Sequence, residues 1–154
     1  MIPIVTKEAI FYGFTLTPDQ FKNIVDGLCS DLVEPDDCLK AYVGMYDGWR
    51  RKIPTPERSK VPRLRMIYKP GVNLCLSGED TIDRFIFPTR WVEYESDAQL
   101  QDQALLEPND QDIIRLQDFA AFTEGVYGVK LPPAESFGFG CIKDYHPTQE
   151  WRDW

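Results

Sequence analysis

The chain has 154 residues, a length that is typical of one domain and supports one hydrophobic core rather than two. Hydrophobic residues account for 43% of the chain and aromatic residues for 13%, so a disordered protein is excluded and a folded globule is expected. The formal net charge is −8 at pH 7, which disfavours binding to nucleic acid. No stretch is apolar over the roughly 18 to 20 residues that cross a bilayer, so no membrane span is expected.

The first helix is the element that the local sequence marks most clearly. It follows residues 10–16, whose aromatic and β-branched side chains favour a strand. Thr17, Pro18 and Gln20 have the types expected at the cap, the first position and the third position of a helix with a capping box. Apolar residues then recur at helical spacing and predict the face that packs on the core: Phe21, Ile24, Val25 and Leu28.

A second helix and a basic segment are expected next. The acidic residues within 34–37 suit a first helical turn, and the apolar stripe that follows predicts a helix ending by Gly48. Residues 50–63 contain three prolines, each without an amide donor for a helix or a central strand. This Pro-rich basic segment is therefore predicted to be an exposed, extended loop.

The middle and the end of the chain predict most of the sheet. Residues 64–69 and 72–76 flank a Pro-Gly pair that suits a tight turn, so an antiparallel hairpin is expected. Pro88 forces an edge, a bulge or a break within the strands that follow. Further strands are predicted at residues 85–87, 90–94, 126–131 and 137–142.

A third helix is predicted with Asn109 or Asp110 as its cap and Gly125 at its end. Its buried stripe is expected to contain Ile113, Ile114, Leu116, Phe119 and Ala120. Together these elements predict an α+β fold, with residues 1–154 in a single domain. The fold is expected to hold a mostly antiparallel sheet of about 4–6 strands packed against about two or three helices.

Charge is distributed unevenly along the chain. Residues 50–65 carry seven basic residues against Glu57, whereas residues 93–118 carry eight acids against Arg115. The basic segment has three candidate partners: the acidic segment of the same chain, another protein, or nucleic acid, which the acidic net charge disfavours. Its residues predicted to contact a partner protein are Arg50, Arg51, Lys52, Arg58 and Lys60.

Candidate catalytic groups are few. His146 is the only histidine, and Cys141 is the potential nucleophile nearest to it, with Asp144 as an orienting carboxylate in the pattern of a thiol hydrolase. A structural role for His146 is the simpler interpretation. The Gly-Phe-Gly run at 138–140 lacks the third glycine of a dinucleotide fingerprint, and the carboxylates lack the spacing of a calcium loop. No catalytic residue, metal ligand or cofactor is therefore predicted.

The remaining predictions concern the four cysteines and the two tryptophans near the carboxyl terminus. The four cysteines lack the close paired spacing of zinc and redox motifs, and no secretory signal is recognised, so free thiols in the cytoplasm are expected. The tail, residues 145–154, contains Trp151 and Trp154. These side chains are expected to dock on their own domain or to anchor a partner.

The uneven charge predicts a role in protein recognition without catalysis. The leading interpretation is a module whose acidic face meets a basic surface of its partner, as in an inhibitor or a neutralising protein. The residues assigned to this acidic face are Glu93, Glu95, Asp97, Asp102, Glu107, Asp110 and Asp112. Two alternatives stay open: a small enzyme or small-molecule-binding domain that uses carboxylates or Cys141, and a structural or assembly subunit.

Overall fold

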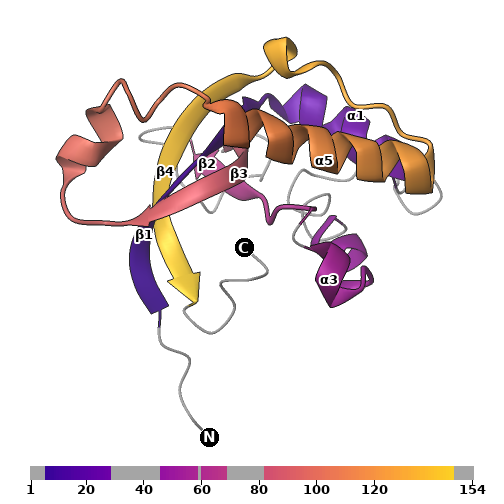
Figure 1. Cartoon of the computed structure of the whole chain (residues 1–154), viewed down its shortest axis with the longest axis horizontal. Coiled ribbons are helices and arrows are strands. Elements are labelled where there is room, and N and C mark those ends of the chain that lie inside the picture. Colours follow the sequence, from indigo (N-terminus) through magenta and orange to yellow (C-terminus); the bar gives the residue numbers. More distant parts are fainter. Residues whose placement is uncertain (1–5, 29–45, 59, 69–81, 148–154) are drawn as a thin grey trace, which may run out of the picture.

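The computed structural model describes residues 6–28, 46–58, 60–68 and 82–147. They form a single α+β fold, and its four-stranded antiparallel sheet confirms the predicted fold class (Figure 1). The strands lie in the order β2-β3-β1-β4. Their bounds are β1 (Thr6–Leu16), β2 (Arg65–Tyr68), β3 (Ile82–Glu93) and β4 (Gly138–Pro147).

Two helices, α1 (Pro18–Leu28) and α5 (Asp110–Tyr127), lie on the same face of the sheet (Figure 1). Short helical pieces complete the described part, at residues 46–51 and in α3 (Thr55–Arg58), η1 (Asp97–Gln101) and η2 (Ala134–Ser136). One aromatic core joins helices and sheet. The ring centroids of Phe21 and Phe85 are 4.2 Å apart, and those of Phe87 and Phe119 are 5.0 Å apart. Among the described residues, no helix is both long enough and apolar enough to span a bilayer.

The capping box predicted at the start of α1 is confirmed. The amide of Gln20 donates to the Thr17 hydroxyl at 3.2 Å, and the Thr17 amide donates to the Gln20 side chain at 2.8 Å. These bonds satisfy two of the amides that a helix start leaves without an intrahelical partner. The predicted apolar face is also confirmed, since α1 buries Phe21, Ile24 and Val25.

Strand β3 contains a bulge next to Pro88 and continues beyond it without a break. Tyr12 pairs with Arg90 and Gly13 pairs with Pro88, so Thr89 is an extra residue in β3. The bulge brings the β3 backbone close to Gly13, where an added Cβ atom would lie 1.9 Å from the carbonyl oxygen of Phe87. Only glycine fits there, which is the physical reason for a glycine inside the apolar run of β1.

The third predicted helix forms as α5, with differences at its end. Asn109 is the N-cap, as expected, and its side chain accepts a hydrogen bond from the amide of Asp112. The helix continues through Gly125 to Tyr127, where Gly128 ends it with a left-handed φ of 69°. The strand predicted at 126–131 is therefore wrong, and Ile114, placed in the buried stripe, is 45% exposed.

The basic segment is folded rather than extended, so the prediction of an exposed loop at 50–63 is wrong. Arg50 lies in the helical piece at 46–51, is 6% exposed, and donates through Nε to the Val61 carbonyl at 2.7 Å. Ile53 and Val61 are buried in the core. Most of the second predicted helix and the second hairpin strand, 72–76, lie outside the described residues, and the described helical piece continues past Gly48.

Candidate functional site

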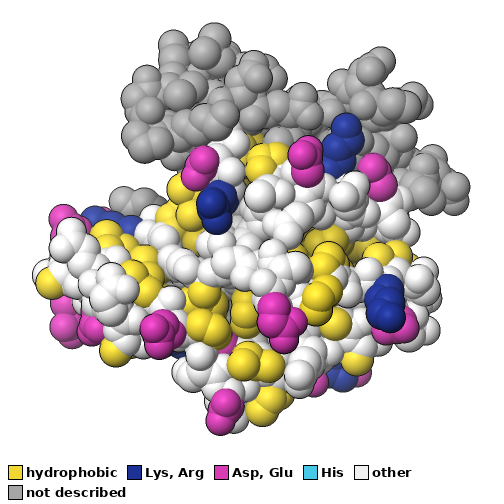
Figure 2. Space-filling view, turned by 90° about the horizontal axis from the view of Figure 1, so that it is seen from above, with side chains coloured by type: hydrophobic (Ala, Val, Ile, Leu, Met, Phe, Trp, Pro, Cys, Tyr) yellow, Lys and Arg dark blue, Asp and Glu magenta, His cyan; other side chains and the backbone are white. Residues whose placement is uncertain are grey.

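Residues 93–110 form a connection that we call the acidic loop, which runs from the end of β3 through η1 to the start of α5. The loop holds six acids and no Lys or Arg. η1 lies on the left in Figure 1, and several acidic side chains lie at the same end of the molecule in Figure 2. All six are exposed: Glu93, Glu95, Asp97, Asp102, Glu107 and Asp110. The structure thus places six of the seven residues assigned to the acidic face on the surface.

Arg90 holds the carboxyl-terminal half of the acidic loop. Its Nη2 donates to the carbonyl oxygens of Leu105 at 2.7 Å and Glu107 at 3.2 Å. The guanidinium also lies over the ring of Tyr12, 4.8 Å from the centroid. Hydrogen bonds to a charged donor are stronger than neutral ones, so this side chain fixes the path of the loop.

Asp112, the seventh residue assigned to the acidic face, is buried, so its assignment to an accessible surface is wrong. It is 1% exposed, and its Oδ2 lies 3.3 Å from Nε of Arg90. The carboxylate also accepts hydrogen bonds from the Thr89 hydroxyl at 2.7 Å and the Asn109 amide at 2.9 Å. These contacts compensate for the desolvation of the carboxylate, and they make Asp112 part of the scaffold beneath the loop.

The amino-terminal half of the acidic loop is held by Gln99 and two tyrosines. The Gln99 side-chain oxygen accepts from the amides of Glu95 at 2.7 Å and Ser96 at 3.1 Å. The Tyr12 hydroxyl donates to the Gln99 carbonyl at 3.2 Å, and burial raises the pKa of that tyrosine. Tyr94 donates to Asp97 at 2.7 Å, and this hydrogen bond raises the pKa of Tyr94.

The acidic loop and the basic segment do not neutralise one another. Glu93 pairs with Lys7 at 2.9 Å, and Lys60 pairs with Glu57 at 3.0 Å. Within the described ranges, none of the ion pairs that form joins residues 50–63 to residues 93–110. In Figure 1, α3 lies at the opposite side of the molecule from η1. The two charged regions therefore face solvent separately.

The five basic residues assigned to partner binding have different environments. Arg51, Lys52 and Lys60 are exposed. Arg58 is half-buried and donates to the carbonyls of Arg51 and Ile53, whereas Arg50 is buried and supports the Val61 backbone. Two of the five therefore have a structural role, because their guanidinium groups tie the segment together. Trp151 and Trp154 lie outside the described residues.

Of the candidate pair Cys141 and His146, the structure describes only the Cys141 side chain. On β4 the backbone of Cys141 pairs with Tyr12, and that of His146 pairs with Lys7. The Cys141 thiol donates to the Leu100 carbonyl at 3.8 Å, and burial raises its pKa, which lowers the thiolate fraction. Among the residues that the structure describes, no group of three potential ligands is arranged to hold a metal ion.

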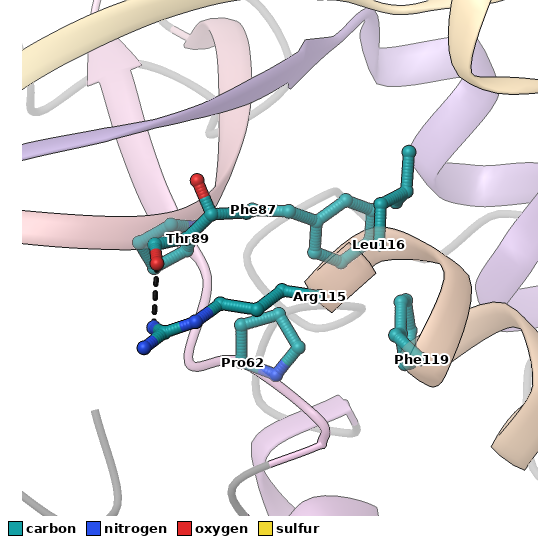
Figure 3. A pocket seen from close by; sticks show the side chains of 7 residues that line it. Pro62, Phe87, Thr89, Arg115, Leu116 and Phe119 are labelled. Carbon is teal, nitrogen blue, oxygen red and sulfur yellow. Dashed lines mark hydrogen bonds between the residues drawn. The ribbon is translucent and has the colours of Figure 1, made fainter. Parts of the chain in front are cut away.

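A small pocket lies where α5 crosses the bulge of β3 (Figure 3). Its water-accessible volume is about 20 Å³. The residues that line it are Pro62, Phe87, Pro88, Thr89, Arg115, Leu116 and Phe119. Sequence reasoning identified the apolar positions on α5 but missed this site, because Pro62 and Pro88 meet α5 only in the folded chain.

Comparison of the chain with models of protein families, with curated proteins and with solved structures gave no match.

Proposed function

We propose that the protein is a protein-binding module without catalytic activity, whose acidic loop docks against a basic surface of its partner. The observation that carries this proposal is the set of six exposed carboxylates in a loop without a basic residue. Such a field steers a basic partner into contact and repels acidic competitors.

The scaffold beneath the acidic loop supports a role in binding. Arg90, Tyr12 and Gln99 fix the loop backbone through hydrogen bonds to both of its halves. A loop that is ordered before binding loses less conformational entropy when a partner docks, so more of the interaction energy contributes to affinity. Glu93 forms an ion pair, and the carboxylates of Asp97 and Asp102 accept hydrogen bonds. The other three carboxylates of the loop, those of Glu95, Glu107 and Asp110, form neither kind of contact within the described part of the chain. They are the best candidates for direct contacts.

Partner capture with charge-reversed loop variants tests the proposal. The test variant carries Glu95→Lys, Glu107→Lys and Asp110→Lys together, and bait protein is incubated with native extract at low and moderate salt. We expect a basic partner to bind the unchanged protein, to dissociate as salt rises, and to be lost from the variant.

A matched control variant distinguishes the effect of charge reversal in the acidic loop from the effect of the change in net charge. Asp118→Lys, Glu124→Lys and Glu135→Lys produce the same change in charge at exposed positions of α5 and η2. The proposal requires that this control keeps the partner. Equal capture by both triple variants, or no basic partner at either salt concentration, would show that the acidic loop is not the binding surface.

A further inference from the structure

The end of α5 carries an exposed apolar surface beside basic residues. Val126 is 59% exposed and Tyr127 is 40% exposed. The ring centroids of Tyr127 and Trp49 are 5.1 Å apart, and the Lys52 amide donates to the Trp49 carbonyl at 3.1 Å. The end of α5 therefore lies beside the turn that carries the exposed residues Arg51 and Lys52. We call Arg51, Lys52, Val126 and Tyr127 the α5-end patch.

The two cations of the α5-end patch are available to a partner. Arg51 and Lys52 form no ion pair with another described residue. Such cations attract carboxylates, and the exposed side chains of Val126 and Tyr127 favour apolar groups that leave water with them. The patch therefore suits a partner surface that presents carboxylates around apolar side chains.

The acidic loop of the chain itself presents this combination. Leu105 and Leu106 are half-buried, so part of each residue is accessible. Asp102 and Glu107 flank them and are exposed. Arg90 binds the carbonyl oxygens of Leu105 and Glu107, which fixes this part of the loop before any contact forms. The loop therefore matches the α5-end patch in charge and in apolar content.

Helix α5 separates these two surfaces within one molecule. The acidic loop ends at Asp110, where α5 starts, and the α5-end patch lies at the other end of the helix. A helix of 18 residues is about 27 Å long. Figure 1 shows η1 and the end of α5 at opposite sides of the molecule. The two surfaces can therefore meet only between two copies of the chain.

We propose that a second copy of this chain is the partner of the acidic loop, which docks on the α5-end patch of that copy; this inference rests on the proposed function, because it names the partner. The contact joins two different surfaces, so it is head-to-tail and continues into a ring or a filament. The net charge of −8 repels copies at long range. At about 0.15 M salt, charges more than about 8 Å apart are largely screened, so the facing groups dominate.

Sedimentation equilibrium at about 0.15 M salt tests this proposal. The weight-average mass of the unchanged protein should rise with concentration to at least twice that of the monomer. A loop variant carries Glu95→Gln, Glu107→Gln and Asp110→Asn. A patch variant carries Arg51→Gln, Lys52→Gln and Val126→Ser, and it keeps Tyr127, whose ring packs on Trp49. Each variant should stay monomeric, because it lacks one of the two surfaces.

An equimolar mixture of the two variants tests the head-to-tail arrangement. The patch variant keeps an intact loop and the loop variant keeps an intact patch, so the mixture should form dimers and nothing larger. The control carries Arg84→Gln and Lys143→Gln at exposed positions of β3 and β4, and it should assemble like the unchanged protein. A monomeric unchanged protein at every concentration, assembly by either variant alone, or a mixture that stays monomeric would overturn the proposal.

The two proposals fail in different ways. A chain that stays monomeric but captures a basic partner of another sequence through its acidic loop would refute self-association and leave the proposed function intact. Absence of loop-dependent binding to any protein, added copies of the chain included, would refute both.

Discussion

Arg90 and Asp112 form a partly buried ion pair that links the β3 bulge to the first turn of α5. The Nε atom of Arg90 lies 3.3 Å from Oδ2 of Asp112, and the exposed fractions of the two side chains are 23% and 1%. The same guanidinium binds the carbonyl oxygens of Leu105 and Glu107. The position of the acidic loop therefore depends on a contact between a strand and a helix.

Removal of the Asp112 carboxylate should be strongly destabilising. Asp112→Ala leaves the Arg90 guanidinium without its carboxylate partner and removes the shorter of the two hydrogen bonds of the Thr89 hydroxyl. We expect the free energy of unfolding to fall by about 3–5 kcal/mol, measured by urea denaturation. The control Asp118→Ala removes an exposed carboxylate of the same helix and should change it by no more than about 0.5 kcal/mol. Similar losses for the two variants would contradict a structural role for the pair.

Two glycine substitutions should have opposite effects on stability. Gly13→Ala places a Cβ atom 1.9 Å from the Phe87 carbonyl oxygen, so we expect a loss of at least about 4 kcal/mol or failure to fold. Gly125→Ala meets no atom within 4 Å and lies inside α5, so it should stabilise the protein by about 0.5–1 kcal/mol. Thermal unfolding of both variants checks the prediction. A well-folded Gly13→Ala protein would show that the bulge is not as close as described.

Loss of the Gln99 side chain should loosen the acidic loop without unfolding the domain. Gln99→Ala removes the acceptor for the amides of Glu95 and Ser96. These amides should exchange with solvent about tenfold faster, while amides of β1 keep their protection. Hydrogen exchange followed by NMR measures both. Gln103→Ala, at an exposed site in the same loop, serves as the control and should leave the two amides unchanged.

The Cys141 thiol should react slowly with alkylating reagents. Burial raises its pKa, so at a given pH it holds less thiolate than a small-molecule thiol, and thiolate is the reactive form. We expect iodoacetamide to label Cys141 more slowly than the cysteine of a short unstructured peptide at pH 8, with a rate that rises at higher pH. Peptide mapping by mass spectrometry measures this rate. Labelling as fast as that of the free thiol would contradict the described burial.

Local chemistry explains which elements were predictable. The start of α1 and the start of α5 depend on side chains within one helical turn, so Thr17, Gln20 and Asn109 identify them directly. The end of α5 was less predictable. Gly125 was expected to end the helix, but a glycine inside a helix costs only about 0.5–1 kcal/mol, and Gly128 takes the left-handed conformation instead.

The candidate sites were less predictable than the elements. Most acidic residues of the loop were placed on the surface by composition alone, but Asp112 was misassigned because an acid in a first helical turn is usually solvated. Its burial results from Thr89 and Arg90, which the sheet brings to the helix. The pocket at Arg115 gave no local signal, since its lining comes from the basic segment, β3 and α5.

The sequence by itself determined the fold class, the helix starts and the separation of charge between residues 50–65 and 93–118. Only the tertiary structure decided which of those charges are available to a partner. Burial and ion pairing depend on contacts between residues far apart in the chain, such as Arg90 with Asp112 and Arg50 with Val61. Composition and spacing do not predict those contacts, because strand order and register decide which residues meet.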